Sequence, residues 1–197
     1  MTPQPHDLVE LTAHGARHIC ADAPAWVRAS IERAPWVVVR RERLAGAICV
    51  GVRGRARNER FAASIDTAHV ASLVTPEMLA PRTSVRAHSV FDTLRSVRDV
   101  ASSFDLIWGP TGAAGYELAT SCTALHAGSD LDVLVRAEPN HPSLPAFAAH
   151  VRALPVRVDV ELAFGDGLGA ALEEALRDGE LLVKTFDGPA LLERAVR

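Results

Sequence analysis

The chain has 197 residues, of which 48% are hydrophobic, and a formal net charge of −3. This length allows one large domain or two small ones around a core. No apolar run is long enough to cross a bilayer, and the first residues lack the basic and then apolar layout of a secretory signal, so we expect a cytoplasmic protein with no membrane partner. The small negative charge offers no general attraction to nucleic acid, and no nucleic-acid partner is expected.

The three cysteines, Cys20, Cys49 and Cys122, are odd in number and far apart in the sequence. None belongs to a Cys-x-x-Cys pattern, which argues against a disulfide framework and against a zinc ribbon. We therefore expect reduced, mostly buried thiols.

The first half of the chain predicts a small antiparallel sheet. A short helix is expected at residues 24–34, and three strand-like runs follow at 36–40, 47–52 and 60–65, separated by turns that contain Gly and Arg. Residues 75–81 predict a short helix followed by a linker. We place an N-terminal α+β domain at residues 1–84, with donor or carrier binding as its hypothetical role.

From about Val85 onward, helices and strands alternate. In chain order we expect a helix to Ser102, a strand at 105–108, a helix opened by Gly112, a strand at 130–135, a helix at 143–153, a strand at 156–164, a helix at 168–177, a short strand at 181–185 and a final helix. Strands that alternate with helices form a sheet covered by helices. The predicted fold class is therefore α+β, with a second domain at residues 85–197.

Two carboxylates in the stretch Ser129-Asp130-Leu131-Asp132 point to a metal site. Side chains two apart on a strand project from the same face, so Asp130 and Asp132 would lie together, with Cα atoms roughly 6–7 Å apart. That spacing suits carboxylates that converge on one or two divalent cations, and Mg²⁺ is the natural choice because it takes oxygen ligands.

A third acid lies on a later strand. In residues 156–162 the alternation buries the valines and places Arg157, Asp159 and Glu161 on the other face. Asp159 could complete the metal site from a neighbouring strand. The alternative is that Asp130 and Asp132 merely open a strand at its solvent-exposed end.

Residues 104–115 read as an apolar strand that runs into a glycine-rich turn and then a helix. Such a turn exposes backbone N–H groups at the positive end of the helix, where phosphate binds well. It is not a Walker loop, because the Gly-Lys-Ser/Thr sequence is missing. The alternative is that the turn only joins two elements.

This order of features resembles the DNA polymerase β-like nucleotidyltransferase superfamily. More narrowly, Trp108-Gly109-Pro110-Thr111-Gly112, Gly115-Tyr116-Glu117-Leu118-Ala119 and Ser129-Asp130-Leu131-Asp132 are similar to malonate decarboxylase holo-[acyl-carrier-protein] synthase, a phosphoribosyl-dephospho-CoA transferase. Pro5-His6-Asp7-Leu8-Val9 and the strand at 36–41 extend the resemblance over most of the chain.

The resemblance implies a nucleotidyltransferase-type mixed sheet flanked by helices. It also implies transfer of the phosphoribosyl-dephospho-CoA group from 2'-(5''-triphosphoribosyl)-3'-dephospho-CoA to a serine of the apo acyl-carrier subunit of malonate decarboxylase, with release of pyrophosphate. The implied catalytic and Mg²⁺-binding residues are Asp130, Asp132 and Asp159. The implied phosphate-binding residues are Gly109, Thr111, Gly112 and Ser129.

One departure from the superfamily pattern lies at the start of the phosphate-binding helix. The superfamily usually carries Gly-Ser or Gly-Gly there, whereas this chain has Gly112-Ala113. The hydroxyl is absent, and Thr111 or Ser129 could provide one.

Several basic residues have two interpretations each. Arg53, Arg55 and Arg57, with Arg60 behind them, could form a phosphate-facing row or a charged edge that blocks strand pairing. A second group could bind the CoA-like donor or an acidic carrier; its members are Arg40, Arg41 and Arg43. His14 and His18 are treated as surface or capping residues, because the local sequence is not clearly helical.

Two other functions stay open. One is a nucleotidyltransferase that uses a nucleoside triphosphate on another acceptor. The other is an inactive nucleotidyltransferase fold that acts as a binding module, although the presence of all three aspartates counts against it.

Overall fold

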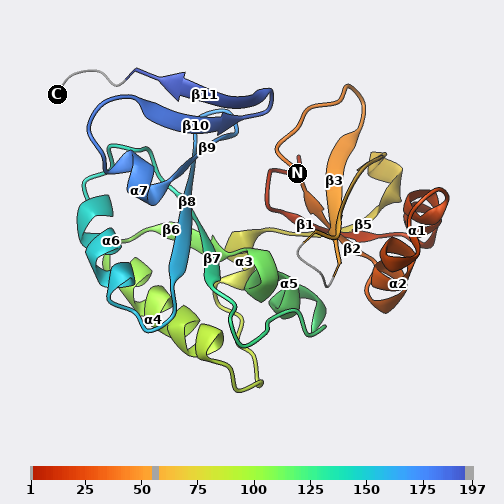
Figure 1. Ribbon diagram of the computed structural model, residues 1–197, viewed down its shortest axis with the longest axis horizontal. Coiled ribbons are helices and arrows are strands. Elements are labelled where there is room, and N and C mark those ends of the chain that lie inside the picture. Colours follow the sequence, from red (N-terminus) through yellow and green to blue (C-terminus); the bar gives the residue numbers. More distant parts are fainter. Residues whose placement is uncertain (1, 55–57, 194–197) are drawn as a thin grey trace.

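The computed structural model describes residues 2–54 and 58–193, which form two β-sheets with separate cores (Figure 1). The first sheet has five strands in the order β4-β3-β2-β1-β5, and the second has six in the order β11-β10-β9-β8-β7-β6. The first is antiparallel throughout, whereas the second contains the parallel pair β7–β8. The predicted α+β class, with an antiparallel sheet and a mixed sheet, is confirmed.

The N-terminal half builds the five-stranded sheet and covers one face with helices. Its elements are β1 (Leu8–Leu11), α1 (Ala13–Cys20), α2 (Ala25–Arg33), β2 (Trp36–Val39), β3 (Ile48–Arg53), β4 (Arg60–Ile65), η1 (Thr67–His69) and β5 (Val70–Val74). Alternate strand residues such as Val37 and Val50 pack against Val27 and Ile31, which lie one turn apart on α2. Side chains return to the same face every two residues along a strand and about every 3.6 residues along a helix, so these apolar side chains meet in one core.

The C-terminal half builds the six-stranded sheet. Its elements are α3 (Pro76–Leu79), α4 (Ser89–Ser103), β6 (Ile107–Pro110), α5 (Gly112–Thr120), β7 (Leu131–Arg136), α6 (Leu144–Arg152), β8 (Val158–Phe164), β9 (Leu168–Ala171), α7 (Leu172–Ala175), β10 (Leu181–Thr185) and β11 (Gly188–Leu192). Val90, Leu94 and Val97 form the buried stripe of α4, which packs with α6 on one side of the sheet (Figure 1).

The opposite face of the six-stranded sheet is turned toward the N-terminal half. Leu8 of β1 and Val74 of β5 pack with Leu79 of α3 in a small cluster that joins the two halves, and Tyr116 of α5 packs against it. The even-numbered residues of β7 lie on this face, and they include Asp132 and Arg136.

The helix predicted at residues 168–177 is wrong. Gly165 and Gly167, at φ of +48° and +75°, form a tight turn after β8, so the chain folds back and β9 pairs antiparallel with β8. Only the following segment, α7, is helical. Close packing also favours a strand here, since a Cβ on Gly169 would lie 2.5 Å from Nη2 of Arg41.

The predicted final helix is also wrong. Gly188, at φ of +116°, closes a turn, and β11 pairs antiparallel with β10 from Leu181–Leu192 to Thr185–Gly188. The Thr185 hydroxyl donates a hydrogen bond to the Gly188 carbonyl oxygen (2.8 Å) and fixes that turn.

Three N-terminal elements, β1, α1 and β5, were not predicted. The segment around His14 and His18, whose sequence is not clearly helical, forms α1, and both histidines are exposed on it, as expected for surface residues. Gly15, in the middle of α1, obscured the helix; a Cβ there would lie 2.8 Å from the carbonyl oxygen of His69. Packing of α1 against η1 therefore demands the glycine that weakens the helical pattern.

The cysteines are free, as expected; Cys49 is buried, and Cys20 and Cys122 are half-buried. Among the described residues, no helix combines the length and the apolar character needed to cross a membrane.

Candidate active site

The parallel pairing of β7 and β8 brings two of the predicted aspartates together. Asp132 is directly opposite Asp159 in the strand register, so both side chains project from the same face of adjacent strands. Asp132 and Asp159 are half-buried, whereas Asp130 precedes β7 and is exposed. The face that carries these aspartates is the one turned toward the N-terminal half.

The charges of Asp130 and Asp159 both act on Asp132. Burial raises the pKa of Asp132, and the charges of Asp130 and Asp159 raise it further, while Arg53 and His6 act to lower it. Like charges gathered in this way are mutually repulsive, so the cluster favours binding of a cation or of a proton. Arg53 and His6 come from the N-terminal half, so both halves contribute charge to the site.

The start of α5 lies directly against Asp132. Gly112 has a φ of +57°, and a Cβ there would lie 1.9 Å from Oδ2 of Asp132. The backbone N–H of the buried Thr111 donates a hydrogen bond to the carbonyl oxygen of Asp132 (2.9 Å). The chain therefore needs glycine at position 112 both for its backbone conformation and for room beside the carboxylate.

The other two predicted phosphate-binding residues, Gly109 and Ser129, have surroundings that differ from those of Thr111 and Gly112. Gly109 lies inside β6 opposite Leu134, and a Cβ there would lie 1.9 Å from the carbonyl oxygen of Pro76, so close packing of α3 accounts for this glycine. Ser129 lies in the turn before β7, where its Oγ accepts a hydrogen bond from the His126 N–H (3.0 Å). Thr111 and Gly112 are the members of the set that contact Asp132, Gly112 at its carboxylate and Thr111 at its backbone carbonyl oxygen.

The donor chemistry of the aspartate cluster fits Mg²⁺, since every candidate ligand is a carboxylate oxygen. Within residues 2–54 and 58–193, no three His, Cys, Asp or Glu side chains are gathered closely enough to hold one ion. Asp159 is turned toward Arg157, with 2.8 Å between Oδ1 and Nη2. The Arg157 side chain is 77% exposed, and an ion pair at such a surface contributes little, so Asp159 is free to exchange this partner for another cation.

A fourth carboxylate on the same face, Glu161, is tied to cations from both halves. It lies two residues beyond Asp159 and accepts hydrogen bonds from His6 Nε2 (3.0 Å), from Arg41 and from Lys184. Burial would raise its pKa, but the hydrogen bonds and charges of His6 and Lys184 lower it to about 2. Glu161 is therefore a half-buried anion that links the two sheets.

Sequence reasoning missed this arrangement, because the partners of Glu161 are spread over the whole chain. Its only local signal was the alternation that places Glu161 on the face of Asp159. His6 has a φ of +76°, a conformation that costs a non-glycine residue on the order of 1–3 kcal/mol and is found mostly at functional sites. In this conformation the His6 ring contacts Glu161, and that contact offsets part of the conformational free energy.

Next to His6, the carboxyl group of Asp7 is almost fully enclosed. Asp7 is 1% exposed; its Oδ2 accepts a hydrogen bond from the Gln4 N–H (2.8 Å), whereas Oδ1 has no partner among the described residues. Burial raises the pKa of Asp7 to about 6, against smaller opposing effects that include the charge of Arg136. Asp7 therefore opposes folding once it is ionised.

The two predicted groups of arginines differ in their surroundings. Arg53 and Arg60 are cross-strand neighbours on β3 and β4 and are exposed, while Arg55 and Arg57 lie outside the described residues. Members of the second row are occupied by partners: Arg40 pairs with Glu42, Arg41 with Glu161, and Arg43 with Asp166.

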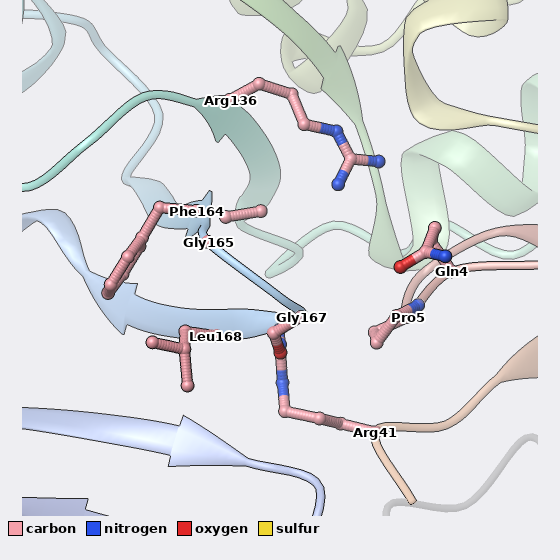
Figure 2. Close-up of a pocket in the computed structure, with 9 residues that line it drawn as sticks. Gln4, Pro5, Arg41, Arg136, Phe164, Gly165, Gly167 and Leu168 are labelled. Atoms are coloured by element: carbon pink, nitrogen blue, oxygen red, sulfur yellow. The ribbon is translucent and has the colours of Figure 1, made fainter. Parts of the chain in front are cut away.

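A cavity of about 100 Å³ opens at the far end of the same sheet face (Figure 2). It is bounded by Gln4 and Pro5 near the N-terminus, by Arg41 after β2, and by Arg136 at the end of β7. The turn between β8 and β9 closes the remaining side. Like the aspartate cluster, this cavity lies between the two halves.

Comparison with known proteins covers nearly the whole chain. Residues 4–76 match the family model for the phosphoribosyl-dephospho-CoA transferase MdcG N-terminal domain, and residues 78–195 match that for the MdcG C-terminal domain. Curated proteins called phosphoribosyl-dephospho-CoA transferase are similar throughout. The Pseudomonas syringae protein is 38% identical over 95% of this chain and 90% of its own length.

Two further relatives carry the same name. A Klebsiella pneumoniae protein is 40% identical over 96% of this chain and 94% of its own length, and the Pseudomonas aeruginosa protein is 36% identical over 97% and 92%. No solved structure matches the chain.

The two parts of the chain thus match the two domains of one class of enzyme, the transferases of a CoA-derived group. More particularly, the chain belongs to the phosphoribosyl-dephospho-CoA transferase family. The family predicted from its motifs is confirmed.

Proposed function

We propose that the chain transfers the phosphoribosyl-dephospho-CoA group from 2'-(5''-triphosphoribosyl)-3'-dephospho-CoA to a serine hydroxyl of the apo acyl-carrier subunit of malonate decarboxylase. The observation that carries the proposal is the side-by-side placement of Asp132 and Asp159 beside the start of α5. A carboxylate pair next to a helix N-terminus can serve both the metal and the phosphate chain of a triphosphate donor.

The bond changes of the proposed reaction are those of an in-line displacement. The serine oxygen attacks the α-phosphorus of the donor, the bond from that phosphorus to the α–β bridging oxygen breaks, and pyrophosphate leaves. Asp159 accepts the serine proton. Its exposed pairing with Arg157 leaves the carboxylate accessible for that role.

Backbone N–H groups at the start of α5 bind the phosphate chain, with Gly112 closest to the Asp132 carboxylate. The N–H of Thr111 is already donated to the Asp132 carbonyl oxygen, so Thr111 contributes its hydroxyl. Arg53 adds positive charge from the N-terminal half. Gly109 and Ser129 act indirectly. Gly109 allows β6 to pack against α3, and Ser129 holds the turn that positions Asp130.

Asp130 and Asp132 would hold one Mg²⁺, and Asp159 would help hold a second. When bound, Mg²⁺ would neutralise triphosphate charge and favour departure of pyrophosphate.

We further propose that the chain divides by function near residue 84. Residues 1–84 would bind the donor or the carrier, and residues 85–197 would carry out the transfer. The contacts of His6 and Arg41 with Glu161 support this division of labour, since they align the two halves across the site.

The test is incubation with Mg²⁺, labelled triphosphoribosyl-dephospho-CoA and the apo carrier subunit, with labelled ATP and CTP in parallel reactions. We expect label on a carrier serine from the CoA-like donor alone. Label from ATP or CTP would instead favour a nucleotidyltransferase of another kind, and no transfer from any donor would contradict the proposal.

A further inference from the structure

The cavity at the far end of the sheet face is formed by both halves of the chain. Arg136 enters it from the end of β7, Arg41 enters from the segment after β2, and Gln4 lies at a third side (Figure 2). Among the described residues that line it, two are guanidinium groups and none carries a carboxylate. The cavity is thus suited to an anion.

Both guanidinium groups are held in place by other contacts. Arg136 donates from Nε to Glu77 Oε1 (2.7 Å), and Arg41 donates to Glu161 and to the Gly167 carbonyl oxygen. An arginine has five N–H donors, so these contacts leave donors on each side chain for a ligand. Arginines fixed in this way lose little conformational entropy when they bind an anion, and their planar shape suits phosphate oxygens.

The cavity and the aspartate cluster share one strand face. Arg136 lies four residues beyond Asp132 on β7, which places their Cα atoms about 13 Å apart at about 3.3 Å per residue. The intervening position on β8 is Glu161, whose charge is matched by the cations around it. A ligand that extends along this face would reach from one site to the other.

We propose that this cavity binds the diphosphate of the dephospho-CoA arm of the donor. This inference rests on the proposed function. The donor carries two anionic groups, a triphosphate on one ribose and the diphosphate of the CoA arm, and two ribose units separate them. With the triphosphate at Asp132 and the start of α5, the second anionic group lies along β7 toward Arg136.

The size of the cavity limits what it takes. Sites for a whole ligand typically measure about 300–1,000 Å³, whereas this one measures about 100 Å³. It accommodates one charged group of a large donor and leaves the adenine ring and the pantetheine chain outside. Phe164 and Leu168 provide an apolar wall beside the guanidinium groups.

The experiment fills the cavity without removing either arginine. Ala163 lines it opposite Arg136 in the strand register, so Ala163→Leu adds bulk there. Ala149→Leu, on the exposed side of α6, is the matched control. Isothermal titration would measure binding of dephospho-CoA, which lacks the triphosphate, and separately of inorganic triphosphate with Mg²⁺.

We expect Ala163→Leu to weaken dephospho-CoA binding by about tenfold or more, the worth of one or two charge-assisted contacts, and to leave triphosphate binding unchanged. Ala149→Leu should change neither. A second variant, Arg136→Lys, keeps the positive charge beside Glu77 but loses the planar fork, and should weaken dephospho-CoA binding in the same selective way.

The outcomes separate the two proposals. A wild-type chain that transfers the group and binds dephospho-CoA, with both variants binding it equally well, would overturn the cavity assignment and leave the function intact. A wild-type chain that neither transfers the group nor binds dephospho-CoA would overturn both. Equal weakening of triphosphate and dephospho-CoA binding would show a general loss of structure and would also contradict the assignment.

Discussion

Asp132 and Glu161 project from the same face of the same sheet, yet their environments are opposite. Asp132 has two neighbouring carboxylates and a raised pKa, whereas Glu161 has three cationic or imidazole partners and a pKa lowered to about 2. One acid is left with uncompensated charge in a cleft, and the other is neutralised where two sheets meet. The difference separates a candidate catalytic carboxylate from a structural one.

The aspartate cluster should dominate activity and contribute nothing to stability. We expect Asp130→Asn to lower the rate of group transfer by about 10³-fold, because interactions with developing charge typically contribute on this scale. The midpoint of thermal unfolding should stay the same or rise, since the change relieves repulsion with Asp132. Mass spectrometry of the carrier, with a thermal melt, measures both.

Glu161 should show the reverse behaviour. We expect Glu161→Gln to lower the free energy of unfolding by about 3 kcal/mol, since it leaves Arg41, whose side chain is only 11% exposed, without its anionic partner. Glu173→Gln removes an exposed pair with Arg152 and should change it by no more than about 0.5 kcal/mol. Urea unfolding measures both; equal effects would show that the Glu161 cluster contributes no special stability.

The glycine beside Asp132 should also matter for activity. We expect Gly112→Ala to reduce transfer by about 10²-fold, because its Cβ would displace the Asp132 carboxylate. Gly179→Ala is the control: its φ is also positive, at +92°, but a Cβ there would meet no atom within 4 Å. The control should share a loss of stability of about 1 kcal/mol but retain activity. Similar activity in both variants would place Gly112 outside the site.

Asp7 and Glu161 should make the free energy of unfolding depend on pH in opposite directions. The raised pKa of Asp7 means that its contribution is present below pH 3.8 and lost as the pH rises through about 6, a change of up to about 3 kcal/mol. The lowered pKa of Glu161 means that its contribution is present above pH 4.5 and lost as the pH falls toward about 2.

Urea unfolding of variants between pH 4 and pH 7 separates the Asp7 effect from that of Asp132, whose pKa is also raised. Asp7→Asn should reduce the loss of stability that wild type shows over this range, whereas Asp22→Asn, at an exposed position, should leave it unchanged. An unchanged pH dependence in Asp7→Asn would assign the effect to another group.

Local patterns were sufficient to predict the strands that carry the aspartates. Alternation of apolar and acidic residues gave β7 and β8, and their parallel pairing then placed Asp132 beside Asp159. The same kind of pattern failed at β9, because the glycine turn at 165–167 and the space needed by Arg41 determine that strand. The second of these constraints comes from a residue more than a hundred positions away.

The cluster around Glu161 was not predictable from local sequence. His6, Arg41 and Lys184 belong to segments that meet only when both sheets have formed. The two hairpins of the C-terminal region, β8–β9 and β10–β11, were also missed or misread as helix, and they position Lys184. Sequence therefore identified the acids with uncompensated charge, while tertiary structure was needed to identify the paired one.

The most direct test compares single-turnover transfer by Asp132→Asn and Glu161→Gln at a temperature at which both variants are folded, with circular dichroism as the check on folding. The account predicts that Asp132→Asn leaves the carrier serine unmodified, while Glu161→Gln still modifies it. Modification by Asp132→Asn at a rate close to that of the wild type would contradict the central claim that this aspartate cluster is the active site.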